Sequence, residues 1–171
     1  LAEEGNYPLV IGRAELGGCS LQRHWELAEL AEKNPDDRKG KPYKDKSLRE
    51  LLSDGKWHVV TLQQNSMNSG DVSTYRPYAE NLYNFIKSIQ PEAKVVFHQT
   101  WAYRSDSKDF SRIAENEYAK SDKEMWEKLR AAYQTIADEL GIDIIPVGDA
   151  FWKVSSQKKR GYHADPGFEE S

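Results

Sequence analysis

The sequence has one cysteine, no long apolar run and no surplus of basic residues. A single thiol cannot form an internal disulfide, so the cysteine content does not indicate a redox compartment. No run approaches the roughly 18 apolar residues of a transmembrane helix. With a formal net charge of −4, the chain also lacks the basic surface that binds nucleic-acid phosphates. We therefore expect neither a membrane nor a nucleic acid as its partner.

Spacings typical of metal ligands are absent as well. His24 and His58 are isolated, and no His-x-x-x-His pair is present. The sequence therefore predicts no bound metal and no cofactor.

The chain begins without a Met and without a signal peptide. Residues 1–5 resemble the end of a helix that stops at Gly5, so we expect further structure or a signal upstream of them. The sequence alone does not indicate the cellular compartment of the protein. It is cytoplasmic, or it is secreted or periplasmic if an upstream signal has been removed.

The chain does contain enough apolar material for one core. Hydrophobic residues make up 38% of it, including five Trp, nine Tyr and five Phe, which predicts a single domain over residues 1–171. Four short apolar runs are rich in Val and Ile, as is typical of strands covered on both faces. These runs are Tyr7–Gly12, Trp57–Gln63, Lys94–His98 and Ile142–Val147.

Helical patterns separate the four runs. The clearest helix is Asp122–Leu140, with Ser121 and Glu124 as a capping box and Gly141 as its stop. Strands that alternate with helices require long crossovers and therefore a parallel sheet. We expect a three-layer α/β/α sandwich with a mainly parallel sheet. The other predicted helices are Leu21–Glu32, a helix from Ser47 with Glu50 as its box partner, and Tyr75–Ile89.

Ligands of open parallel sheets bind outside the carboxyl ends of the strands. Three of the four runs are followed there by uncharged hydrogen-bonding groups, including paired glycines and adjacent amides. Backbone N–H groups and side-chain amides of this kind can stabilise a developing oxyanion. The groups are Gly17-Gly18-Cys19-Ser20, Gln63-Gln64-Asn65-Ser66, and Gln99-Thr100-Trp101 after His98.

Each of these groups also has a structural interpretation. The glycine pair suits a tight turn, and a Gln after a strand suits a cap. His98 suits a hydrogen bond to a neighbouring loop, and Trp101 with Tyr103 suits either packing or the wall of a sugar-binding or acyl-binding groove. Cys19 is a candidate nucleophile by position, although no base accompanies it. Asp149 is predicted to N-cap a short helix over residues 150–154.

Several of these segments resemble conserved blocks of the SGNH hydrolases, also called GDSL-type hydrolases. The run 16–21 resembles the second block, in which a glycine N–H donates to the oxyanion. The run 59–64 takes the place of the third block, with a Gln pair where most of the superfamily has Asn. Together with 97–103 and 145–151, these runs resemble an uncharacterised SGNH-like bacterial family.

The resemblance covers nearly the whole chain, from Gly5 to about Trp152, and implies a flavodoxin-like SGNH fold. It implies that Gly18 N–H and the Gln64 side chain are the oxyanion donors. The remaining groups of the expected substrate pocket are Cys19, Gln63, His98, Gln99 and Trp101.

Two departures from the SGNH pattern limit this interpretation. The nucleophilic serine of the superfamily lies in a Gly-Asn/Asp-Ser turn after the first strand, and this sequence has no such turn. The final block has an Asp three residues before the catalytic His, whereas Arg160 stands three residues before His163. We therefore expect the first strand with its serine upstream of Leu1, and the Asp/His pair beyond Ser171. Within the chain, His163 is the candidate base of this final block, and His98 at its strand end is a second candidate, for a base or a polar ligand.

These observations predict a serine esterase or acyl hydrolase of SGNH type, acting on a small-molecule or glycan ester such as an acylated carbohydrate. Without a nucleophile and a base, the chain alone is expected to be inactive. Two alternatives stay open. One is a non-catalytic domain that binds a glycan or small ligand, and the other is a flavodoxin-like binder of a nucleotide or flavin at residues 17–20.

Overall fold

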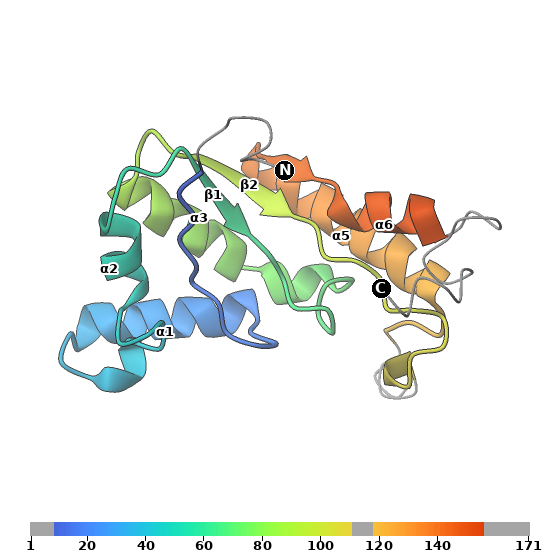
Figure 1. Ribbon diagram of the computed structural model, residues 1–171, viewed down its shortest axis with the longest axis horizontal. Coiled ribbons are helices and arrows are strands. Elements are labelled where there is room, and N and C mark those ends of the chain that lie inside the picture. Colours follow the sequence, from blue (N-terminus) through green and yellow to red (C-terminus); the bar gives the residue numbers. More distant parts are fainter. Residues whose placement is uncertain (1–8, 111–117, 156–171) are drawn as a thin grey trace.

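A computed structural model of the chain describes residues 9–110 and 118–155 and shows helices around a small sheet (Figure 1). In Figure 1, the first three α-helices occupy the left half of the view and the last two occupy the right half. The strands are β1 (Val59–Leu62), β2 (Lys94–His98) and β3 (Asp143–Ile145). The α-helices are α1 (Leu21–Lys33), α2 (Leu48–Ser53), α3 (Tyr78–Ile89), α5 (Asp122–Leu140) and α6 (Val147–Ser155). The 3-10 helices are η1 (Arg38–Gly40) and η2 (Val72–Tyr75).

The three strands form one parallel sheet in the order β1-β2-β3. The crossover from β1 to β2 contains α3, and the crossover from β2 to β3 contains α5. Leu62 lies beside Phe97, and Phe97 lies beside Ile144 in the register. The predicted α/β class, a parallel sheet flanked by helices, is confirmed.

One face of the sheet carries the hydrophobic core. Side chains alternate between the two faces along a strand, so Leu62, Val95 and Phe97 point the same way. They belong to one buried cluster with residues of α1, α2, α3 and α5. The rings of Tyr75, Phe97 and Tyr133 meet edge to face within this cluster, with centroids 5.4 to 6.2 Å apart. This geometry is the favourable one for aromatic pairs.

The opposite face of the sheet is more open. Val96 is buried there, but Val59 and Ile145 are 51% and 40% exposed, and Thr61 and Gln63 are exposed. Parallel sheets are usually covered on both faces. The difference leaves side chains of this face accessible where the strands end.

Local capping groups set several helix boundaries. The box predicted at α5 is half formed, because the Glu124 carboxylate accepts the N–H of Lys120 at 2.8 Å. Ser121 Oγ accepts the N–H of Glu124 at the start of α5, and Gly141 ends that helix in the left-handed conformation, with φ 63°. Ser47 and Glu50 form the expected capping box at α2. These signals act within a few residues, which is why the sequence alone reveals them.

Three elements differ from the prediction. The helix expected from Tyr75 begins at Tyr78, because the chain forms η2 first and Pro77 then precedes the helix. Residues 9–12 were expected in a strand but form none, since they pair with no strand among the described residues. The last helix begins at Val147, so Asp149 lies in its first turn and does not cap it. The carboxylate of Asp149 instead accepts the Nε1–H of Trp126 at 2.7 Å.

Candidate functional site

Gln64 connects three elements at the carboxyl edge of the sheet. Its side chain is 1% exposed, and its Oε1 accepts the N–H of Leu21 at 3.1 Å and of Asn65 at 3.0 Å. Its Nε2 donates to the carbonyl and to the hydroxyl of Thr74, both at 3.2 Å. Every polar atom of this amide therefore has a partner. The side chain predicted to donate to an oxyanion donates to Thr74 instead.

Tyr133 is hydrogen-bonded to the backbone of Gln64. The N–H of Gln64 donates to Tyr133 Oη at 3.0 Å. Burial raises the pKa of Tyr133 to about 12 and also raises the pKa of Tyr75 beside it. Tyr75 donates its hydroxyl to the carbonyl of Ser69 at 2.8 Å. Both phenols are therefore neutral hydrogen-bonding groups of the core.

The glycine turn before α1 lies next to the end of β1. Gly18 has a φ of 65°, which glycine adopts without strain. Asn65 Nδ2 donates to the carbonyl of Gly18 at 3.1 Å, and Asn65 Oδ1 accepts the N–H of Asn68 at 2.9 Å. Within the described ranges, the Gly18 N–H donates to no other residue. The two segments predicted to hold the oxyanion donors are thus brought together, and Asn65 makes the contact.

Cys19 lies half-buried in this turn as an ordinary thiol. Burial is the main cause that raises the pKa of Cys19, so the reactive thiolate is disfavoured at neutral pH. Its Sγ approaches the carbonyl oxygen of Ser20 at 3.7 Å. His24, further along α1, has its Nδ1 2.7 Å from Tyr43 Oη, and burial lowers the pKa of His24. His24 is therefore engaged with Tyr43, and no hydrogen bond between His24 and Cys19 occurs among the described residues.

Three side chains form a row on the open face of the sheet. Because Leu62 pairs with Phe97 and His98 pairs with Ile145, the row consists of Gln63, His98 and Ile145. The Nδ1 atom of His98 is buried and has no hydrogen-bond partner in the described part of the chain. A buried polar atom without a partner is uncommon in proteins. This nitrogen does not make the loop hydrogen bond that the structural interpretation expected.

Gln99 has the same linking role at the end of β2. It is 2% exposed, and its Oε1 accepts the N–H of Asp149 at 2.9 Å. A side chain at Gly148 would place its Cβ 2.2 Å from the carbonyl oxygen of Thr100, so the start of α6 approaches β2 as closely as only glycine permits. Gln99 therefore joins β2 to α6 and has little surface for a substrate.

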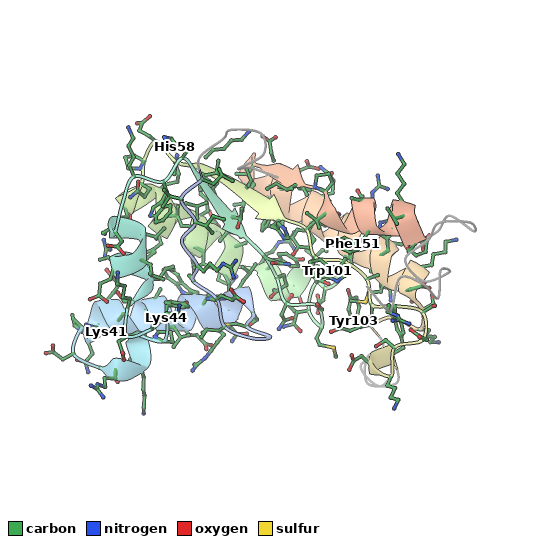
Figure 2. The ribbon with its side chains drawn as sticks, in the orientation of Figure 1. Lys41, Lys44, His58, Trp101, Tyr103 and Phe151 are labelled. Atoms are coloured by element: carbon green, nitrogen blue, oxygen red, sulfur yellow. The ribbon has the colours of Figure 1, made fainter. Side chains whose placement is uncertain are left out.

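An aromatic cavity lies next to this link. Trp101 stacks on Phe151 with ring centroids 5.2 Å apart. These two residues, Tyr103 and Trp152 line a cavity of about 470 Å³. Figure 2 shows Trp101, Tyr103 and Phe151 gathered in one region beside α6.

Several residues of this edge had no individual role predicted from the sequence. Asn65 directly follows the Gln pair, so its place in the chain was an available signal. Phe151 and Trp152 follow the last strand by a few residues, which was a second signal. His163, the candidate base, lies outside the described residues. Nothing in the sequence indicated the hydrogen bonds that Thr74 and Tyr133 make with Gln64.

Two general features complete the site. No group of three or more His, Cys, Asp or Glu side chains that could hold a metal ion occurs among residues 9–110 and 118–155. None of the helices in the same ranges is long and apolar enough to cross a membrane.

The chain is thus an α/β domain with a parallel sheet and polar groups at the carboxyl edge of that sheet. The sequence pattern of the family described as "Domain of unknown function (DUF4886)" matches residues 1–165, so the chain belongs to this family. It is similar to the crystal structure of a DUF4886 family protein from Bacteroides uniformis, with 27% identity and a TM-score of 0.69. The match covers 88% of this chain and 62% of that relative. No curated protein matches the chain.

Proposed function

We propose that the chain carries the oxyanion-binding part of an SGNH-type serine acyl hydrolase that acts on acylated carbohydrate or a related small ester. The observation that supports this is the contact between the glycine turn and the end of β1, where Asn65 Nδ2 donates to the Gly18 carbonyl at 3.1 Å. The backbone N–H of the left-handed Gly18 can donate to a developing oxyanion. Each such donor can lower the activation barrier by about 3 kcal/mol.

In this proposal the donors are the N–H of Gly18 and an Nδ2 hydrogen of Asn65. Most SGNH hydrolases have an Asn in the corresponding block, where the resemblance put the Gln pair, and Asn65 directly follows that pair. Gln64 becomes a positioning residue, because its Oε1 fixes the N–H groups of Leu21 and Asn65 on either side of the turn.

The proposal requires a serine nucleophile and an Asp/His pair in addition to these donors. The SGNH resemblance places the serine upstream of residue 1 and the pair beyond residue 171. The relative from Bacteroides uniformis extends well beyond the part that this chain matches, since only 62% of it is covered. A longer protein of this family thus has chain in which such groups can lie.

The experiment treats the natural protein that contains this chain with a fluorophosphonate probe and identifies the labelled peptide by mass spectrometry. We expect a labelled serine in a Gly-Asn/Asp-Ser turn after an upstream strand, together with hydrolysis of p-nitrophenyl acetate. The variant Asn65→Ala should lower kcat about 100-fold. Asn84→Ala, on the exposed side of α3, is the matched control and should leave kcat unchanged. Absence of both labelling and hydrolysis would overturn the proposal.

A non-catalytic glycan-binding domain is the second candidate, and the aromatic cavity beside Trp101 favours it. The flavodoxin-like alternative loses its main support at the start of α1. The N–H of Leu21 donates to Gln64 Oε1 and the N–H of Arg23 donates to Ser20 Oγ, both at 3.1 Å. A phosphate bound at this helix N-terminus would need these two N–H groups as donors, but both already have acceptors within the protein.

A further inference from the structure

The cavity beside Trp101 has the size and position of a ligand site. Its volume of about 470 Å³ falls within the range of roughly 300–1,000 Å³ that small-ligand sites occupy. Trp101 lies three residues after His98, which ends β2, and the opposite wall comes from α6, which follows β3. The cavity therefore adjoins the carboxyl edge of the sheet, where the polar groups of the proposed active site also lie.

Its main wall is a pair of solvent-exposed aromatic rings. Trp101 and Phe151 are each 41% exposed, although they stack at 5.2 Å with 21° between their planes. Large apolar side chains gathered at the surface of a protein mark binding sites. The face of an aromatic ring is electron-rich, so it attracts the weakly positive C–H groups on the flat side of a sugar ring.

Trp152 forms a second aromatic wall of the cavity and is fixed by packing on its other side. Trp152 lines the cavity and stacks on Trp126, with ring centroids 4.8 Å apart and 12° between the planes. The Nε1–H of Trp126 donates to Asp149 at 2.7 Å, and the guanidinium of Arg130 lies 5.7 Å from the centre of a Trp126 ring. A wall that is ordered before a ligand arrives loses little entropy on binding.

Apart from Ala102 and Tyr103, the rest of the lining is polar. The guanidinium of Arg104 donates to both carboxylate oxygens of Asp106, at 3.1 and 2.8 Å, which orients the two groups. Asp122, Ser107 and Ser155 also line the cavity. Among the described lining residues, one guanidinium stands against two carboxylates, so these side chains disfavour an anionic ligand. Donors and acceptors around an aromatic wall suit the hydroxyl groups of a neutral sugar.

We propose that this cavity is a carbohydrate subsite, in which a neutral sugar ring lies against the Trp101–Phe151 pair and its hydroxyl groups bond to the Arg104–Asp106 side. The inference rests on the proposed function and deepens it, because it assigns the sugar part of the substrate to a defined place. Apolar acyl chains are a poorer fit, since they would exclude water from a charged part of the lining.

The test measures sugar binding by the natural protein without any turnover. The probes are methyl β-glucoside, methyl β-galactoside, methyl α-mannoside and N-acetylglucosamine, followed by saturation-transfer NMR and tryptophan fluorescence. We expect millimolar binding of at least one probe. Trp101→Ala should weaken it about tenfold, the loss of one stacking contact, whereas Trp101→Phe keeps an aromatic face and should stay within about threefold of wild type. Trp57→Phe is the control, because Trp57 lies outside the cavity.

Phe151→Ala is the second variant, and circular dichroism confirms that each variant is folded. Failure of all four sugars to bind, or binding that neither Trp101→Ala nor Phe151→Ala weakens, would overturn the subsite. Binding of butyrate at Trp101 with no sugar binding would also overturn it. Sugar binding without ester hydrolysis would support the subsite and refute the hydrolase, while hydrolysis without sugar binding would do the reverse.

Discussion

Two adjacent glutamines at the end of β1 have opposite surroundings. Gln64 is 1% exposed and hydrogen-bonded at every polar atom, whereas Gln63 is exposed on the other face of the sheet. The end of β2 repeats the contrast, since Gln99 is 2% exposed and Trp101 is 41% exposed. We call Gln64, Gln99, Tyr75, Tyr118 and Tyr133 the inner part of the edge, since the three tyrosines pack in the same core. The outer part consists of Gln63, His98, Trp101 and Phe151.

The contrast shows that residue type alone does not assign a role at this edge. Successive residues of a strand point to opposite faces, so a shift of one position moves an amide from solvent into the core. A buried amide must then find hydrogen-bond partners inside the protein. The inner part therefore stabilises the fold, whereas the outer part contains the side chains of the proposed binding site.

Alkaline pH should have the largest effect, because it acts on the tyrosines of the inner part. Burial raises the pKa of Tyr133 and of Tyr118 to about 12, and it raises the pKa of Tyr75 as well. Unfolded tyrosine loses its proton near pH 10, so above that pH the unfolded chain binds fewer protons than the folded chain. The free energy of unfolding should fall above pH 10, by up to about 1.4 kcal/mol per pH unit for each tyrosine.

Urea unfolding between pH 8 and 12, with tyrosinate absorbance followed in parallel, measures this loss. The variant Tyr133→Phe should lose stability less steeply than wild type above pH 10, because one buried phenol is gone. Tyr83→Phe, in α3, is the matched control and should keep the wild-type slope. Stability that stays constant from pH 9 to pH 12 would contradict the prediction.

Gln64→Ala should have the next largest effect. It removes four hydrogen bonds and leaves the N–H groups of Leu21 and Asn65 without their partner. We expect a loss of about 3 kcal/mol in the free energy of unfolding, measured in urea at pH 7. Gln63→Ala is the control one residue away and should change stability by less than about 0.5 kcal/mol. Equal losses in the two variants would remove the distinction between the inner and outer parts.

The sequence predicted those features that depend on neighbours in the chain. The stop at Gly141, the capping box of Ser47 with Glu50, and the alternation of strands and helices all follow from short-range patterns. The partners of Gln64 could not be predicted in this way, because Tyr133 lies 69 residues further along the chain. Asn65 was expected only as one of the polar groups after this strand, since the direction of a side chain just after a strand depends on the following turn.

Gln99→Ala should have a smaller effect than Gln64→Ala. It removes one partly buried hydrogen bond, from the N–H of Asp149, and frees the start of α6 from the end of β2. We expect a loss of about 1.5 kcal/mol in the free energy of unfolding. Amide hydrogen exchange should also quicken in α6 more than in α1. Gln134→Ala, which removes an exposed hydrogen bond to Asp138 on α5, is the control and should cost less than about 0.5 kcal/mol. Unchanged exchange in α6 would argue against the link.

Of these substitutions, Trp101→Ala should have the smallest effect on stability. Unlike the others, it should weaken sugar binding. The ring is 41% exposed and gives up mainly its stacking on Phe151, so we expect a loss of about 1 kcal/mol in urea unfolding. The same substitution should weaken sugar binding about tenfold, as argued above. Gln64→Ala should lower stability at least twice as much, yet folded protein should keep its sugar affinity, because Gln64 does not line the cavity. If Trp101→Ala destabilised the protein as much as Gln64→Ala, Trp101 would belong to the core, and the division of this edge into two parts would fail.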